Sequence, residues 1–466
     1  MRFTARCAEL LTQGQIRWSI PLSPSEPNSL MMNALARSLL AGELAVEGIV
    51  ARMSATLGRE WRWLKPLAQR YVVWNAGRVR PRRDEVVQFL LHDRGFQSAW
   101  ARLSKELKVA SFLTQGQEMQ RVAAAEGWNL PAICSVGALA DWLHLSEAEL
   151  EWFADLKGLG SRRCDSKLRH YHYRLLAKDG GSVRLIEAPK ERLKEIQRRI
   201  LWWILDFIPV HAAAHGFCEG RSIRTFVAPH VGQRVVLRMD LQDFFPSFAG
   251  ARIQAFFRMA GYPEMVADRL GGLSTTGTPG SLWKELGRGI DGNVLHEARA
   301  LYARPHLPQG APTSPALANL CSYRMDCRLS GLALSVGASY TRYADDLAFS
   351  GDAVFARQVR GVAAEIAAIA MDEGFAVNHR KTRVMGQGVR QSLAGLVTNE
   401  RVNVARDEYD LLKAILHNCV RFGPESQNRE GLTSFRMHLL GRVGFVESIH
   451  PARGERLRSI FERIVW

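Results

Sequence analysis

Two kinds of hydrophobic spacing divide the chain. Residues 38–64 and 85–107 place apolar side chains three and four positions apart, which is the spacing of one helix face. We therefore expect the first 130 or so residues to be mostly helical. Pro81 and the basic stretch 78–85 should interrupt these helices, because proline disfavours a helix interior.

Beyond residue 130, short strands alternate with helices. Residues 136–146 and 147–156 predict two short helices, with Ser146 capping the second. Residues 171–178 and 182–189 flank the turn Asp179-Gly180-Gly181 and predict a hairpin. Later predicted elements are helix 190–208, strand 235–245, two strands joined by an acidic turn within 338–351, helix 356–375, and helices over the last 65 or so residues. This mixture predicts an α+β fold.

Composition is that of a folded globular protein, with 47% hydrophobic and 23% charged residues. No apolar run reaches the roughly 18 residues of a membrane span, so we expect no membrane partner. The seven cysteines are scattered, without a C-x-x-C pair, which argues against a disulfide scaffold or a cysteine-based zinc finger. Such cysteine usage fits a reducing compartment and predicts a cytoplasmic protein.

The net charge says more about the partner of this protein than its composition does. The chain carries 62 Lys and Arg against 46 Asp and Glu, a net charge of +16. Residues 151–466 hold 44 of these basic residues and 32 of the acidic ones. This surplus predicts a polyanionic partner, most often nucleic acid.

The candidate chemistry lies in two acidic clusters that end predicted strands. Asp345 and Asp346 form the tip of the 338–351 hairpin, and Asp240 ends the apolar run that starts at Val235. By itself an Asp-Asp pair is most often a solvated turn, and Asp240 alone could simply cap a strand. Together, three strand-end carboxylates could hold two divalent cations that activate a hydroxyl nucleophile and stabilise a pyrophosphate leaving group.

These clusters resemble the palm of reverse transcriptases. Tyr343-Ala344-Asp345-Asp346 matches the family's Y-x-D-D box, and Asp240 to Phe245 matches its first palm motif. Three further segments follow in the family's order and spacing: Leu307 to Pro315 before the long palm helix, Asn378 to Thr382 with its lysine, and Gln391 to Val397 as primer grip. The resemblance covers about residues 135–466.

The resemblance implies a right-hand polymerase behind a helical N-terminal domain. Fingers would span 131–235, the palm 236–400 with an insertion near 270–305, and a helical thumb 401–466, leaving 1–130 as a domain of unknown role. The implied activity is RNA-directed DNA synthesis from deoxynucleotides. The implied cofactors are two Mg²⁺ ions, with Mn²⁺ as an alternative.

The resemblance also implies residue roles. Asp240, Asp345 and Asp346, with the Leu241 carbonyl, would hold the metals, and Lys381 would protonate pyrophosphate. The nucleotide would meet six residues, among which the Phe245 ring would exclude a ribose 2′-hydroxyl: Arg184, Arg221, Asp243, Phe245, Gln309 and Gly310. The alternative for Arg184 and Arg221, which the resemblance makes the weaker one, is that they are ordinary surface arginines.

Within the family, two further sequence motifs resemble those of the retron type. His215 to Ile223 is typical of bacterial members, and Val397-Thr398-Asn399 resembles the retron Val-Thr-Gly element with its last position changed. RNA and primer contacts would involve His215 and Val397–Asn399, together with thumb arginines that could also be a solvated basic face: Arg436, Arg442, Arg453, Arg456 and Arg458. Retron membership implies a structured noncoding RNA as template and primer, an RNA-linked DNA product, a role in antiphage defence, and a separate effector protein.

Two rival functions are compatible with the same residues. Another bacterial defence polymerase could prime from a protein hydroxyl or extend without a template. A regulator that binds nucleic acid through a vestigial palm is the second rival, although every catalytic position is intact. The N-terminal domain resembles no family that we can name. Several of its tryptophans could stack on bases, but core packing is the simpler explanation: Trp18, Trp61, Trp63, Trp74 and Trp100.

Overall fold

The computed structural model describes residues 29–113, 115–162, 169–178 and 182–466. The chain divides into two compact units. The N-terminal unit comprises residues 1–126, 133–135 and 258–266, and the large unit comprises 127–132, 136–257 and 267–466. Residues 258–266 therefore join the N-terminal unit from the middle of the chain, which no sequence pattern indicated.

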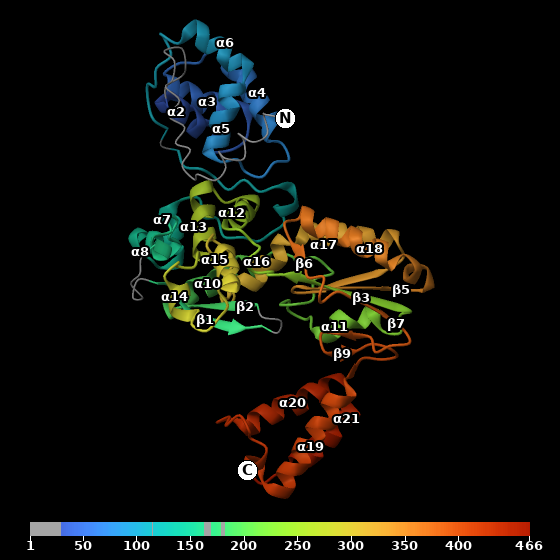
Figure 1. Cartoon of the computed structure of the whole chain (residues 1–466). Helices are drawn as coiled ribbons and strands as arrows, with labels where there is room; N and C mark the ends of the chain where they lie inside the picture. Colours follow the sequence, from blue (N-terminus) through green and yellow to red (C-terminus); the bar gives the residue numbers. More distant parts are fainter. Residues whose placement is uncertain (1–28, 114, 163–168, 179–181) are drawn as a thin grey trace. The chain divides into compact units, whose positions relative to one another are not determined.

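The N-terminal unit is helical over its described part (Figure 1). Its apolar faces bury a shared core that includes Leu35, Ile49, Leu67 and Phe96. Helix α6 begins at Asp93, whose carboxylate accepts a hydrogen bond from the Phe96 N–H at 2.7 Å. The helices of this unit are α2 (Ser29–Leu40), α3 (Val46–Leu57), α4 (Leu64–Asn75), α5 (Arg83–His92), α6 (Arg94–Leu103) and the short η1 (Ala123–Ala125).

Residues 258–266 are bonded into the N-terminal unit at several points. The Gln120 N–H donates to the Gly261 carbonyl at 2.9 Å, and the Arg83 N–H donates to Glu264 at 2.8 Å. Tyr262 is fully buried. This inserted segment is thus tied to the unit by hydrogen bonds.

The large unit begins with a helix pair and a hairpin. Ser146 caps α8 by accepting the Glu149 N–H, as its sequence predicts, while Glu149 bonds back to the Ser146 N–H at 2.8 Å. The hairpin strands pair from Tyr171–Pro189 to Ala177–Val183, and the predicted Gly-rich turn 179–181 lies outside the described residues. These elements are α7 (Val136–Leu143), α8 (Glu147–Ala154), α9 (Leu159–Arg162), β1 (Tyr171–Ala177), β2 (Val183–Pro189), α10 (Glu191–Trp203) and η3 (Leu205–Phe207). The single helix expected over 190–208 is therefore broken at Ile204.

The predicted insertion supports this hairpin. Trp283 and Tyr302 from the insertion bury against Val183 and Leu185 of β2. Its helices are α14 (Leu282–Leu286) and α15 (Gly292–Tyr302), preceded in the chain by α12 (Gly250–Met259) and α13 (Glu264–Ser274).

A five-stranded antiparallel sheet forms the centre of the large unit. Its order is β4-β5-β3-β6, and β7 pairs with β3. Helices α17 and α18 pack on one side, and α11 packs against β4 on the other (Figure 1). The strands are β3 (Val235–Gln242), β4 (Ser339–Tyr343), β5 (Asp346–Gly351), β6 (Ala376–Val377) and β7 (Arg383–Gly386). The helices around them are α11 (Ile223–Val227), η4 (Ala228–His230), α16 (Thr313–Cys321), α17 (Tyr323–Ser335) and α18 (Ala353–Asp372).

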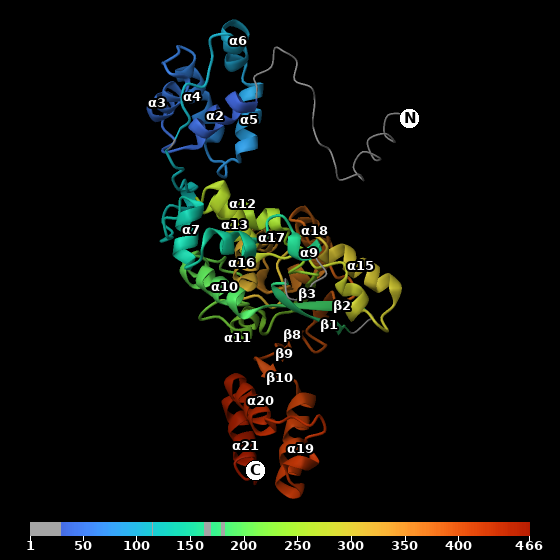
Figure 2. The same ribbon diagram turned by 90° about the vertical axis from the view of Figure 1, so that its left-hand side faces the viewer.

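The C-terminal part is a small sheet followed by three helices that lie side by side in both views (Figure 1, Figure 2). Leu412, Leu416, Val443 and Leu457 pack in one core that also contains Phe226 of α11. The elements are β8 (Ser392–Leu393), β9 (Leu396–Val397), β10 (Asn403–Val404), α19 (Arg406–Phe422), η5 (Pro424–Ser426), α20 (Phe435–Ile449) and α21 (Pro451–Phe461). Among the described residues, no helix is both long and apolar enough to cross a membrane.

A buried ion pair joins the central sheet to its helices. The Arg342 guanidinium of β4 donates to both carboxylate oxygens of Asp326 in α17, at 2.8 and 2.6 Å, and both side chains are fully buried. The same guanidinium donates to the Asn319 side chain and to the Ala344 carbonyl. Tyr340 also donates to Asp326 at 2.8 Å. One arginine thus connects two helices, a strand and the turn after it.

Removing this arginine should destabilise the large unit strongly. Arg342→Met leaves Asp326 buried without its cation, so we expect the free energy of unfolding to fall by about 3–5 kcal/mol. Arg390→Gln is the matched control, because the Arg390–Asp407 pair is exposed and such pairs contribute about 0–1 kcal/mol. Urea unfolding followed by circular dichroism measures both. Equal midpoints for the two variants would show that the buried pair does not hold the unit together.

Candidate active site

The three predicted acids meet at one edge of the central sheet. Asp240 on β3 lies directly opposite Asp346, the first residue of β5, in the antiparallel register. Side chains of such a cross-strand pair point to the same face. Asp345 occupies the turn between β4 and β5, and its carbonyl accepts the Leu241 N–H at 2.9 Å. The fold therefore brings Asp240 next to an adjacent pair of acids that lies far from it in the sequence.

The turn that carries Asp345 has a constrained backbone. Ala344 has a φ of 55°, in the left-handed region that non-glycine residues rarely adopt. Gly216 lies against this turn, since a Cβ there would stand 2.7 Å from the Ala344 nitrogen. The loop around residue 216 therefore needs glycine to approach the acidic turn.

Two cations face the acids. Arg238 donates to both carboxylate oxygens of Asp346, at 2.8–3.0 Å, and the Lys381 ammonium lies 2.9 Å from Asp240. Within the described part of the chain, no group of three His, Cys, Asp or Glu side chains is arranged to hold a metal ion as it stands. Arg238 and Lys381 occupy carboxylate oxygens that a metal would need.

The electrostatics of the acids nevertheless fit a divalent cation. Burial, reinforced by the charges of Asp346 and Asp240, raises the pKa of Asp345 to about 6. Burial also raises the pKa of Asp346, although the Arg238 guanidinium acts in the opposite direction. Carboxylate and carbonyl oxygens are the ligands that Mg²⁺ prefers. The donor set of Asp240, Asp345, Asp346 and Leu241 is therefore chemically suited to such an ion, provided that the two cationic side chains move.

The residues predicted at the nucleotide lie beside this edge. Asp243 has a φ of 46° and is paired with Lys178 at 3.2 Å. The Phe245 ring is partly buried, with its centroid 6.3 Å from that of Phe217. The Phe217 ring in turn lies 6.3 Å from that of Tyr343. A short aromatic row thus runs from the first palm motif to the acidic turn.

Gln309 and Gly310 lie against the backbone of β2, next to a buried pair of Glu187 and His306. The Glu187 N–H donates to the Gln309 carbonyl at 2.9 Å, and a Cβ on Gly310, whose φ is 136°, would stand 3.0 Å from the Glu187 carbonyl. The Glu187 carboxylate bonds to His306 and to Thr278, both at 2.8 Å. Burial alone would lower the pKa of His306, but the hydrogen bond and charge of Glu187 outweigh it and raise that pKa.

The two predicted phosphate-binding arginines differ in their surroundings. Arg184 is exposed on β2. The Arg221 guanidinium donates to the carbonyls of His211, Ala212 and Ala214, so its hydrogen bonds stabilise the loop on which it lies. Only Arg184 presents an exposed side chain.

The predicted RNA-side residues mostly bond within the protein. His215 bonds to Thr225 at 2.9 Å, and its N–H donates to the Arg342 carbonyl. Val397 lies on β9, Thr398 is buried, and the Asn399 side chain accepts the Gln391 N–H. These residues shape the backbone next to the active site.

The C-terminal arginines form a more varied set. Arg436 is exposed and lies 5.9 Å over the Trp466 ring, and Arg442 is partly exposed on the same helix. Arg453 lies over Tyr409, while Arg456 is exposed. Arg458 of α21 forms an ion pair with Glu447 of α20, which partly neutralises the charge of the arginine.

Several residues of this site were missed by the sequence analysis. Arg238 stands two positions before Asp240 on β3, and the period of two in a strand could have placed it on the same face. Lys178, Glu187 and His306 carried no such signal, because each gains its partner from a distant segment.

Comparisons with known proteins agree with this geometry. Residues 176–404 match a family model described as reverse transcriptase (RNA-dependent DNA polymerase). The chain is 41% identical over 304 residues to the retron Mx65 reverse transcriptase of Myxococcus xanthus, covering 65% of this chain and 66% of that protein. It is 37% identical over 348 residues to the retron Mx162 reverse transcriptase of the same organism, covering 72% and 68%. It is 30% identical over 283 residues to the retron Ec86 reverse transcriptase of Escherichia coli, covering 60% and 77%.

The acidic strand edge and the matching family model define a palm-type polymerase with a fold of mixed helix and strand. The matched region spans about two thirds of each of the two Myxococcus relatives. Over this region the chain belongs to the retron reverse transcriptases, which are RNA-directed DNA polymerases.

The raised pKa of Asp345 has a testable effect on stability. A carboxyl whose pKa is higher in the folded than in the unfolded state binds more protons when folded, so stability falls as pH rises from about 4 to about 6. Asp345→Asn cannot ionise and should stabilise the metal-free protein at pH 7 by about 1–2 kcal/mol. Thermal unfolding in EDTA between pH 4 and 8 measures this.

Asp352→Asn serves as the matched control. Asp352 is the exposed N-cap of α18, where hydrogen bonds from the Phe355 and Val354 N–H groups lower its carboxyl pKa. Its replacement should therefore not raise the unfolding temperature at pH 7. If Asp345→Asn lowers that temperature, the carboxylates are not in mutual repulsion.

Proposed function

We propose that this protein copies a structured noncoding RNA into DNA, using the same RNA as template and primer. The observation that carries the proposal is the register of Asp240 against Asp346, with Asp345 in the adjoining turn, in a chain of the retron family. The product would be a single-stranded DNA linked to the RNA. The relatives are named as retron reverse transcriptases, which supports this assignment.

The proposed metal ligands are Asp240, Asp345, Asp346 and the Leu241 carbonyl. Two bound Mg²⁺ ions, or Mn²⁺ in their place, would activate the primer hydroxyl and stabilise the leaving pyrophosphate. Arg238 and Lys381 neutralise the carboxylates when no metal is bound and would turn away when it binds. Lys381, whose side chain is more than half exposed, would then be available to protonate pyrophosphate.

The nucleotide would lie between the sheet edge and the β1–β2 hairpin. Phe245 would lie against the sugar and exclude a 2′-hydroxyl, with Asp243 beside it. Gln309 and Gly310 would contact the nucleotide and the templating strand, because the Glu187–His306 pair holds their loop in place. Arg184 and Arg221 would approach its phosphates, Arg184 more directly since its side chain is exposed.

The large unit would divide its work among three segments of the chain. We propose residues 131–235 as fingers, 236–400 as palm with its insertion at 270–305, and 401–466 as thumb. The thumb would contact the RNA through Arg436, Arg442 and the neighbouring arginines. His215 and Val397–Asn399 would act through the backbone that they shape, since their side chains bond internally. In the cytoplasm, such an enzyme would serve antiphage defence together with a separate effector protein.

The polymerase assignment predicts a strict dependence on the three acids. Asp240→Asn, Asp345→Asn or Asp346→Asn removes one ligand with almost no change in volume. Extension of a primed RNA template should fall at least about a thousandfold, because metal charge lowers the barrier by several kcal/mol. Asp352→Asn, at the far end of β5, should extend normally. Near-normal Mg²⁺-dependent synthesis by any of the three would remove that residue from the site.

The retron assignment predicts a particular product. The protein purified from its native locus should carry one predominant RNA joined through a 2′-hydroxyl to DNA complementary to part of it. Sequencing the bound nucleic acid and mapping its 5′ linkage tests this, and Asp345→Asn should carry the RNA without DNA. DNA attached to a peptide, or DNA without an RNA complement, would instead indicate a protein-primed or untemplated polymerase.

A further inference from the structure

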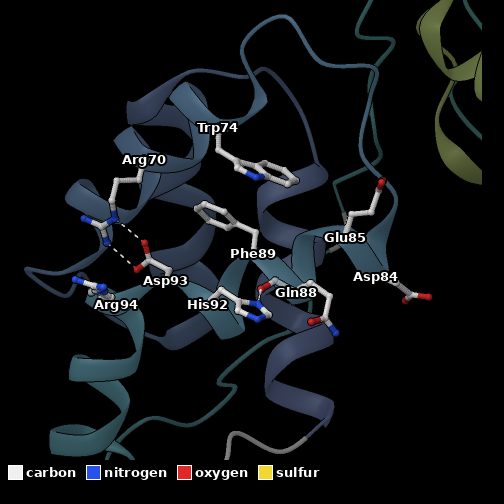
Figure 3. Close-up of a pocket in the computed structure, with 10 residues that line it drawn as sticks. Arg70, Trp74, Asp84, Glu85, Gln88, Phe89, His92, Asp93 and Arg94 are labelled. Atoms are coloured by element: carbon white, nitrogen blue, oxygen red, sulfur yellow. Dashed lines mark hydrogen bonds and ion pairs between the residues drawn. The ribbon is translucent and has the colours of Figure 1, made fainter. Parts of the chain in front are cut away.

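The N-terminal unit contains a hollow that takes no part in the site described above. It has a volume of about 900 Å³, within the range of ligand sites, and opens to solvent over much of its surface. Helices α4 and α5 and the start of α6 line it, and Figure 3 shows the side chains that face it. All of these residues precede the segment that matches the family model.

The centre of the hollow is aromatic. The Trp74 and Phe89 rings are 5.0 Å apart and both are partly exposed (Figure 3). Beneath them, the buried Tyr71 ring contacts both, at 5.9 and 5.5 Å. The Arg78 guanidinium lies 4.8 Å from the Trp74 ring. The two accessible rings thus pack on a buried third ring, and the Trp74 ring already contacts a planar cation.

Two acids that line the hollow have partners within the protein. Asp93 accepts two hydrogen bonds from Arg70, at 2.6 and 2.8 Å, and one from the Phe96 N–H. Glu85 accepts the Arg82 N–H at 2.5 Å at the start of α5. The charge of Asp93 is therefore offset by Arg70, whereas Glu85 bonds to a neutral backbone group and keeps its charge.

The remaining charges of the lining are mixed, but the segment that contains the hollow is basic. Asp84 is exposed and lies 3.7 Å from Arg83. Arg94 is exposed and has no hydrogen bond or ion pair with another residue that the structure describes. Residues 59–108 contain twelve Lys and Arg against five Asp and Glu. An accessible aromatic pair next to an unmatched guanidinium, on a basic segment, is the combination that binds single-stranded nucleic acid.

We propose that this hollow binds an unpaired nucleotide of a single-stranded nucleic acid. The base stacks against Trp74 and Phe89, and a neighbouring phosphate pairs with Arg94. The Gln88 amide, which faces the same hollow, can donate to and accept from a base edge. A second nucleic-acid contact on the N-terminal unit lies beyond the polymerase function and adds affinity through linkage.

Photo-cross-linking of the full-length protein tests the proposal. The probe is a single-stranded RNA about 12 nucleotides long, within the range of such sites, that contains one 4-thiouridine. The cross-linked peptide should include Trp74 or Phe89. Trp74→Leu and Arg94→Gln should each reduce this cross-link about tenfold at sub-saturating protein, while Trp74→Phe should retain most of it.

Arg102→Gln is the matched control. Arg102 lies on the same helix as Arg94, is exposed, and bonds only to its own helix through the Ser98 carbonyl, so the change in charge is identical. Its cross-link should equal that of the wild type. All four variants should extend a generic primed template normally, which separates this site from the polymerase. Failure of extension by the wild type would count against the polymerase and leave this contact standing.

Two results would overturn the proposal. One is a wild-type cross-link map without any peptide from residues 64–103. The other is an equal yield from Arg94→Gln and Arg102→Gln, which would make the hollow a surface for a protein or no site at all. Circular dichroism of each variant verifies that the helices are retained, and Arg94→Gln keeps the test decisive if Trp74→Leu fails to fold.

Discussion

The buried pair of Arg342 and Asp326 is the interaction on which the active-site geometry depends. A guanidinium that is buried away from water needs hydrogen-bond acceptors from the protein. Here α17, α16 and the turn after β4 provide them. The backbone of Arg342 also bonds on both sides, to Ala213 and His215. Contacts within the protein therefore fix the position of Asp345 before any substrate binds.

The acids themselves oppose folding. Asp240 and Asp346 face each other across two strands, and Asp345 is close enough for both charges to raise its pKa. Arg238 and Lys381 relieve part of this repulsion in the protein alone. The cluster of acids lowers the stability of the folded protein, but it creates a site that binds positive charge strongly.

Local patterns predicted much of this structure. The strand that carries Asp240, the acidic hairpin and the Ser146 cap all lie where hydrophobic period and capping chemistry placed them, although β3 ends at Gln242, before its predicted end at Phe245. The palm helix was predicted as continuous, but it breaks at Ser322 into α16 and α17. Glu187 and His306 could not be paired in advance, since their contact joins segments 119 residues apart. Packing also explains the tryptophans only in part: Trp61, Trp63, Trp74 and Trp100 pack on the N-terminal core, yet Trp74 also lines an open hollow.

The membership of residues 258–266 in the N-terminal unit has a consequence during synthesis. The unit's first 126 residues leave the ribosome long before Tyr262, a buried residue of the same unit. At about 5–20 residues per second, the delay is on the order of ten seconds. Throughout that time the Gln120 and Arg83 N–H groups lack the Gly261 and Glu264 oxygens that accept their hydrogen bonds in the folded unit, so the nascent helices must meet water or a provisional partner there.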